Sequence, residues 1–119
     1  MRMHVLGVLL AGLSVAVATA PAGAADLAAA KKSFGIFCAK CHGADGKGNG
    51  ASAATLSTKP RDLTDCKRMK DVKEETLFRA IKEGGESVNL SKDMPAWKDG
   101  MEDDEIHALV SYVRSLCKQ

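Results

Sequence analysis

The pentapeptide Cys38-Ala39-Lys40-Cys41-His42 constrains this chain more than any other feature of its sequence. Two cysteines with two residues between them lie about one helical turn apart, so both thiols can reach one side of a flat ring. A histidine directly after the second cysteine can then direct its imidazole to a metal at the centre of that ring. This C-x-x-C-H pattern is the attachment signature of c-type haem. It predicts thioether bonds from Cys38 and Cys41 and an axial iron ligand from His42.

Three other interpretations of the motif compete with haem attachment. A redox-active C-x-x-C pair is typical of a βαβ unit, and the sequence has no strand pattern. A structural zinc site needs four ligands, usually in two close pairs, whereas Cys66 and Cys117 are isolated in the sequence. A disulfide between the two motif cysteines would leave the histidine after them without a role. Haem attachment explains all three residues together.

The N-terminus has the pattern of a secretory signal peptide. Arg2 supplies a positive charge, residues 5–18 form a mainly apolar run, and Ala22-Gly23-Ala24 is an A-x-A cleavage site. An uncleaved membrane anchor is the alternative, but the apolar run is shorter than the roughly 20 residues that a spanning helix needs. We therefore expect export to the periplasm.

Cleavage divides the chain into a signal peptide, residues 1–24, and a single domain, residues 25–119, with cleavage one residue later as a variant. The 17 basic residues of the chain include Arg2, so the domain keeps 16 basic residues against 15 acidic ones. A near-neutral domain with one Trp, one Tyr and three Phe is not typical of nucleic-acid binding. We expect a monomer that binds no nucleic acid and, once cleaved, is not inserted in a membrane.

Hydrophobic periodicity predicts helices separated by long loops. Helical patterns cover residues 26–37, 72–83 and 102–116, and no strand pattern is present. Asp71 is the expected N-cap of the second helix, with Glu74 at the spacing of a capping box. Residues 43–69 have no period, and a loop of this length is unusual in a small domain unless it wraps a cofactor. The sequence therefore predicts an all-α domain.

These segments, in this order, resemble the class I c-type cytochromes over residues 25–116. Beyond the pentapeptide, the resemblance rests on residues 43–48, 60–64, 75–85, 94–97 and 104–116. It implies a small cytochrome c fold, with three to four helices and long loops wrapped around one covalent haem c. It also implies that histidine and methionine are the axial ligands of the iron.

By this resemblance, Met94 is the second iron ligand. Met94 lies in a loop directly before Pro95, 52 residues after His42, and the proline stiffens that loop. Met101 is the alternative because it also precedes the last helix, whereas Met69 stands between two basic residues and fits least. Two protein ligands would leave no open iron position for a substrate, which favours electron transfer over catalysis.

The resemblance assigns supporting roles to other residues of the loops and helices. The carbonyl of Pro60 would accept a hydrogen bond from the second ring nitrogen of the histidine, unless Pro60 is an ordinary loop proline. Arg61 would neutralise a haem propionate, or else be a solvated surface arginine. Trp97 would cover an edge of the haem. The residues expected to pack the first helix against the last are Ala30, Phe34, Leu109 and Tyr112.

The expected function is that of a periplasmic electron carrier, not an enzyme, with redox proteins as its electron donor and acceptor. Five lysines border the expected haem and would dock an acidic partner, unless they are simply a solvated surface: Lys40, Lys47, Lys59, Lys92 and Lys98. The alternative function is a haem enzyme or a gas-sensing domain with a labile sixth ligand.

Two cysteines remain outside the haem motif. Cys66 and Cys117 do not belong to the pattern of the family, but leftover cysteines in an exported chain most often pair with each other. The sequence therefore predicts a Cys66–Cys117 disulfide. The competing interpretations are two free buried thiols and a Cys117 disulfide between two molecules.

Overall fold

The structure is a computed structural model that describes residue 16 and residues 22–117. Five α-helices form in these residues, together with two 3₁₀ turns, and no strand does. They are α1 (Ala22–Phe37), α2 (Ala39–His42), η1 (Ala53–Thr55), α3 (Cys66–Met69), α4 (Glu74–Glu83), η2 (Gly85–Val88) and α5 (Asp103–Leu116). The all-α prediction is confirmed. The helices outnumber the expected three to four because α2 and α3 are single turns, too short to give a periodic sequence signal.

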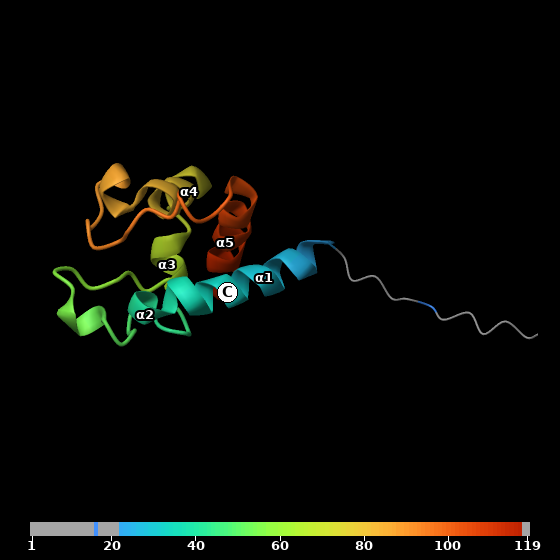
Figure 1. The fold of residues 1–119 in the computed structure, drawn as a ribbon. Helices are drawn as coiled ribbons and strands as arrows, with labels where there is room; N and C mark the ends of the chain where they lie inside the picture. Colours follow the sequence, from blue (N-terminus) through green and yellow to red (C-terminus); the bar gives the residue numbers. More distant parts are fainter. Residues whose placement is uncertain (1–15, 17–21, 118–119) are drawn as a thin grey trace, which may run out of the picture.

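The two longest helices, α1 and α5, cross and pack against each other (Figure 1). The small residue Ala30 is buried at this interface, and the ring centroids of Phe34 and Tyr112 lie 5.3 Å apart. Leu109 of α5 is buried as well. These four residues therefore have the packing roles that the family resemblance implied.

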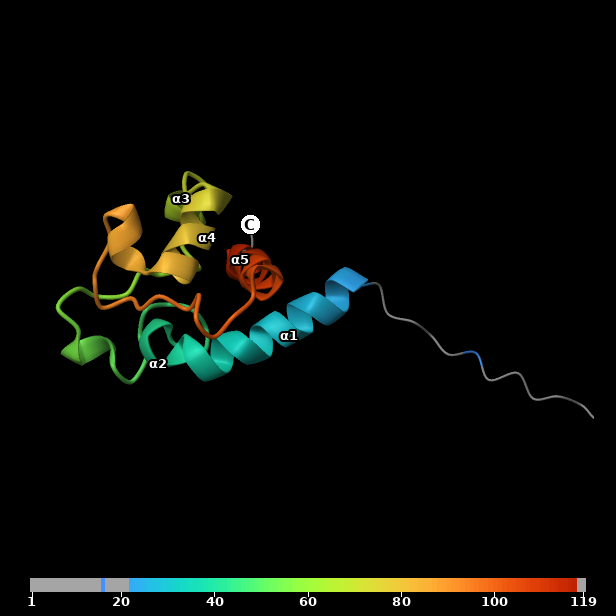
Figure 2. The same cartoon turned by 45° about the horizontal axis from the view of Figure 1, so that its top comes forward.

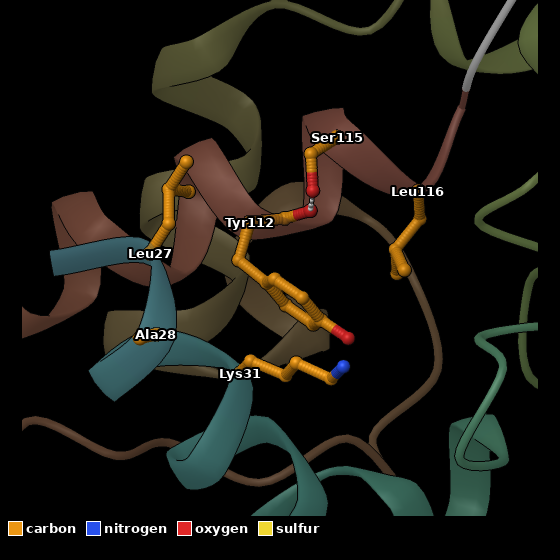
Figure 3. A pocket seen from close by; sticks show the side chains of 6 residues that line it. All are labelled: Leu27, Ala28, Lys31, Tyr112, Ser115 and Leu116. Atoms are coloured by element: carbon orange, nitrogen blue, oxygen red, sulfur yellow. Dashed lines mark hydrogen bonds between the residues drawn. The ribbon is translucent and has the colours of Figure 1, made fainter. Parts of the chain in front are cut away.

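A shallow pocket opens beside this crossing (Figure 3). The ring of Tyr112 lies between the two helices, and its hydroxyl end points in the direction of the Lys31 amino group. The other residues that line the pocket are Leu27, Ala28, Ser115 and Leu116. On α1 the pocket is thus lined by residues 27, 28 and 31, before the cysteine motif that follows this helix.

Helix α4 begins later than the sequence predicted. Its N-cap is Lys73, and the expected N-cap Asp71 lies two residues before it, so that prediction was wrong. The cause is a tertiary contact, because the guanidinium of Arg114 donates hydrogen bonds to the carbonyls of Met69, at 2.6 Å, and Val72. The Val72 carbonyl is therefore bound by a residue of α5, and the first helical bond of α4 runs from the Leu77 N–H to the Lys73 carbonyl.

Helix α5 begins within one residue of its predicted range, 102–116. Glu102 is the N-cap, and it forms a reciprocal capping box with Glu105. Negative charges in this first turn also interact favourably with the helix dipole. One of them, Asp103, forms a salt bridge of 2.7 Å with Lys82 of α4. The start of α5 is therefore fixed both locally and by its neighbour.

The C-terminal end of α5 lies beside α3. The Cα atoms of Cys66 and Cys117 are 4.9 Å apart, and their sulfur atoms are paired. Asp65 is the N-cap of α3, where its carboxylate accepts a hydrogen bond of 3.2 Å from the Arg68 N–H. The Cys66–Cys117 pair and the hydrogen bonds of Arg114 therefore join residues 66–72 to the last helix.

The predicted signal peptide, residues 1–24, lies largely outside the described residues. Helix α1 begins at Ala22, so its first residues include the predicted cleavage site. Along residues 22–117, no helix is both long enough and apolar enough to cross a membrane.

Candidate haem site

The cysteine motif forms one helical turn at the end of α1. Cys38 stands between α1 and α2, and its N–H still donates a hydrogen bond of 2.9 Å to the Phe34 carbonyl. The N–H of His42 donates in turn to the Cys38 carbonyl, also at 2.9 Å. The two cysteines and the histidine therefore lie within a single turn, as attachment to one flat ring requires. Among the described residues, Cys38 and Cys41 are the free cysteines.

The following loop folds back and binds the exposed carbonyls of this turn. The N–H groups of Gly48, Gly50 and Ser52 donate to the carbonyls of His42, Cys41 and Lys40, at 2.7, 3.1 and 2.9 Å. These carbonyls lie at a helix end and have no partner within the helix. Every second residue from Gly48 to Ser52 supplies one donor. This part of the loop therefore follows the motif closely and holds it in place.

The same loop brings a backbone carbonyl to the histidine ring. His42 Nδ1 lies 3.4 Å from the carbonyl oxygen of Arg61. The sequence predicted this role for the Pro60 carbonyl, one residue earlier, and that prediction was wrong. The Pro60 carbonyl instead lies against Gly48 and occupies the space that a side chain at this position would need. The backbone of Gly48 has a φ of +77°. Since a carbonyl only accepts hydrogen bonds, Nδ1 carries the proton, and the lone pair of Nε2 is available for a metal.

Burial changes the protonation of two motif residues. Burial lowers the pKa of His42, and the hydrogen bond to the Arg61 carbonyl opposes part of that shift, so the neutral ring that can bind iron is favoured. Burial also raises the pKa of the Cys38 thiol to about 11, with a smaller contribution from the neighbouring Cys41. Such a thiol differs from the low-pKa thiolate that thioredoxin-type chemistry requires.

The three methionines of the domain have different surroundings. Met69 and Met101 belong to the buried core, with 1% and 8% of their surface exposed. Met94 is only partly buried and packs against the edge of that core. Core methionines fill space between helices. Met94 is therefore the methionine whose side chain is not enclosed in the core.

Backbone hydrogen bonds hold the loop that carries Met94 against α4 and η2. The Gly85 N–H donates to the Met94 carbonyl, and the Trp97 N–H donates to the Ile81 carbonyl, both at 3.0 Å. The ring of Trp97 lies 5.4 Å from that of Phe37, the last residue of α1. Trp97 thus stands beside the end of the helix that leads into the cysteine motif. Its coverage of a haem edge stays a prediction, as does the contact of Arg61 with a propionate.

The donor set of these residues fits a covalent haem. Two free thiols occupy one helical turn, the adjacent imidazole has one nitrogen bonded and one available, and Met94 offers a thioether. A soft sulfur ligand and an imidazole are suited to haem iron. Within residues 22–117, no cluster of three or more His, Cys, Asp or Glu side chains has the arrangement of a metal site.

Sequence reasoning missed a contact between the two loops. Ser57 donates two hydrogen bonds to the carboxylate of Asp93, the residue before Met94. These bonds lower the pKa of the Asp93 carboxyl. No sequence signal pointed to this pair, because its members lie 36 positions apart in the sequence.

Two comparisons of the sequence identify relatives. The family model described as cytochrome c oxidase, cbb3-type, subunit III matches residues 25–113. The Cbb3-type cytochrome c oxidase subunit FixP of Bradyrhizobium sp. (strain ORS 278) is 35% identical over 91 residues. The aligned region covers 76% of this chain but 28% of FixP, so this chain spans less than a third of that relative.

Solved structures of c-type cytochromes share the fold. The KustC0563 c-type cytochrome is 27% identical with a TM-score of 0.60, covering 75% of this chain and 98% of that chain. A chain of the Kuenenia stuttgartiensis reducing HAO-like protein complex Kustc0457/Kustc0458 is 27% identical with a TM-score of 0.65, covering 89% and 50%. With the family model matching from the start of α1 to the last turns of α5, the chain belongs to the cytochrome c oxidase, cbb3-type, subunit III family and is a class I c-type cytochrome.

Proposed function

We propose that this chain is a periplasmic electron carrier that is not itself an enzyme. A single haem c would be attached through Cys38 and Cys41 and ligated by His42 and Met94. The observation that carries the proposal is the contact of His42 Nδ1 with the Arg61 carbonyl, which leaves Nε2 available directly after two free cysteines. A haem bound there supplies reversible one-electron transfer.

The residues of the site each have a task in this function. The Arg61 carbonyl fixes the orientation of the His42 ring, as such backbone acceptors do for metal-bound histidines. Met94 supplies a soft ligand that favours ferrous iron and raises the reduction potential. With both ligands in place, neither a substrate nor a gas has an open position. This closed ligand set supports electron transfer over the alternative of a haem enzyme or gas sensor.

The comparisons support redox proteins as the electron donor and acceptor. FixP is by name a subunit of a cbb3-type oxidase, and one structural relative belongs to a multi-protein complex. The five lysines named above are all exposed. Exposed cations can steer an acidic redox protein to the haem. The signal-peptide pattern supports a periplasmic location, and we propose a monomer that meets its partners transiently.

Expression of the full chain, with its signal peptide, in a host that matures c-type cytochromes tests this function. We expect periplasmic protein whose mass corresponds to the chain after residue 24 plus one haem, with reversible one-electron reduction. Reduced protein should not bind carbon monoxide. A colourless product would contradict haem attachment. Binding of carbon monoxide by the unmodified protein would instead favour the enzyme or sensor alternative.

A further inference from the structure

Ser57 and Asp93 join the loop that follows the cysteine motif to the loop that carries Met94. The backbone N–H of Ser57 donates to a carboxylate oxygen of Asp93 at 3.0 Å, and its hydroxyl donates to the same oxygen at 2.5 Å. We propose that this pair, the Ser57–Asp93 clasp, positions Met94 and keeps the sixth position of the iron closed to external ligands. The inference rests on the ligation by His42 and Met94 proposed above.

The clasp acts on the backbone next to the ligand. Asp93 directly precedes Met94, and its own N–H donates to the Ser91 hydroxyl at 3.2 Å. On the other side, the Met94 carbonyl accepts the bond from Gly85. Met94 therefore lies between an anchor on η2 and an anchor on the opposite loop. Loss of the second anchor would leave the loop attached along the η2 and α4 side alone.

The clasp also closes the fold on the side away from the crossing of the long helices. Helix α2 contacts η1, and α4 contacts both η2 and α5. In both ribbon views, the green segment around η1 and the orange segment around η2 lie on the side away from α5 (Figures 1 and 2). Ser57 follows η1 and Asp93 follows η2, so their hydrogen bonds connect these two groups of elements.

The chemistry of the pair suits a contact that holds a loop but can be broken. Hydrogen bonds to a carboxylate are stronger than those between neutral groups. The contact is exposed, however, so water competes for both partners. A ligand that binds only the open form has an apparent affinity proportional to the fraction of open molecules. Imidazole affinity of the ferric protein therefore measures how well the clasp keeps Met94 in place.

The experiment is a titration of the ferric holoprotein with imidazole. Binding is monitored by the loss of the far-red absorption band that reports the iron–methionine bond. We expect Asp93→Ala to bind imidazole about tenfold more tightly than the unmodified protein. Ser57→Ala should have a smaller effect because its backbone N–H still donates. Ser57→Thr keeps the hydroxyl and should restore normal affinity. The control Asp99→Ala removes the same charge from an exposed residue of the same loop and should change nothing.

A double variant separates the clasp from unrelated effects. The double variant Ser57→Ala/Asp93→Ala should bind imidazole no more tightly than Asp93→Ala alone. The reason is that each substitution disrupts the same contact between the two loops. Unchanged affinity in Asp93→Ala, with a normal methionine band, would overturn the clasp while leaving the ligand assignment intact. A methionine band that persists in Met94→Ala would instead overturn the ligand assignment, and the clasp with it.

Discussion

His42 Nδ1 lies 3.4 Å from the backbone carbonyl oxygen of Arg61, 19 residues further along the chain. The acceptor belongs to the backbone, so replacement of the Arg61 side chain would leave it in place. The position of that carbonyl depends instead on the packing of the loop around it. Leu63 donates to the Gly46 carbonyl at 2.7 Å, and Gly48 lies against the Pro60 carbonyl. These contacts place the acceptor beside the histidine ring.

Gly48→Ala should disturb the histidine through this loop. The new methyl group would collide with the Pro60 carbonyl, at a backbone φ of +77° that side chains rarely adopt. We expect a loss of about 1–3 kcal/mol in the free energy of unfolding, measured with denaturant. A weaker bond to the Arg61 carbonyl would lower the basicity of the imidazole, so the reduction potential should rise.

Gly35→Ala is the matched control for this change. Apart from the adjoining residues and the backbone of α1 itself, no heavy atom of the described residues lies within 4 Å of the Cβ that alanine would add at Gly35. Alanine in a helix is favoured over glycine by about 0.5–1 kcal/mol, so this variant should be more stable than the unmodified protein. Equal stabilities for the two variants would contradict the steric role of Gly48.

His42→Ala should abolish the cytochrome. The iron loses its proposed ligand and the motif loses its attachment signature, so we expect little covalently bound haem in the purified protein. His107→Ala is the control, because His107 is exposed and stacks on the ring of Phe78 with centroids 4.4 Å apart. It should keep normal haem content. A normal absorption spectrum in His42→Ala would refute the motif assignment.

Replacement of Met94 should change the ligation of the iron, whereas replacement of Met101 should change the stability of the fold. Met94→Ala should keep its haem but lower the reduction potential and allow carbon monoxide to bind, because a ligand is lost. Met101→Ala should keep the methionine spectrum but lose about 2–5 kcal/mol of unfolding free energy, because Met101 is 8% exposed within the core. Spectra and denaturant unfolding distinguish the two. The reverse pattern would make Met101 the ligand.

The pairing of Cys66 and Cys117 should contribute to stability. Their Cα separation of 4.9 Å is within the range of a disulfide, and the bridge closes a loop with a sequence separation of 51. By chain entropy, Cys66→Ser combined with Cys117→Ser should cost on the order of 4 kcal/mol, or less where contacts such as those of Arg114 persist. Denaturant unfolding of the exported protein gives this value.

Mass spectrometry of the non-reduced protein checks the pairing directly. We expect a Cys66–Cys117 peptide and no free thiol at either position. Free thiols at both positions would contradict the bridge. A dimer linked through Cys117 would show that the pairing occurs between molecules instead.

The sequence alone determined the parts of this protein that depend on neighbouring residues. The haem motif was recognised because its cysteines and histidine fall within one helical turn. The last helix was predicted to within one residue because its acidic first turn and its apolar period are local features. Packing of Phe34 against Tyr112 followed from the family resemblance, and the buried core confirms it.

Only the tertiary structure decided which distant groups meet. Arg114 binds the Val72 carbonyl, and the N-cap of α4 is Lys73 instead of the predicted Asp71. The loop after the cysteine motif brings the Arg61 carbonyl, and not the Pro60 carbonyl, to the ring of His42. Ser57 and Asp93 meet because two irregular loops approach each other in space. Such contacts depend on where whole segments lie in the fold. The spacing of residues within a single segment does not predict these positions.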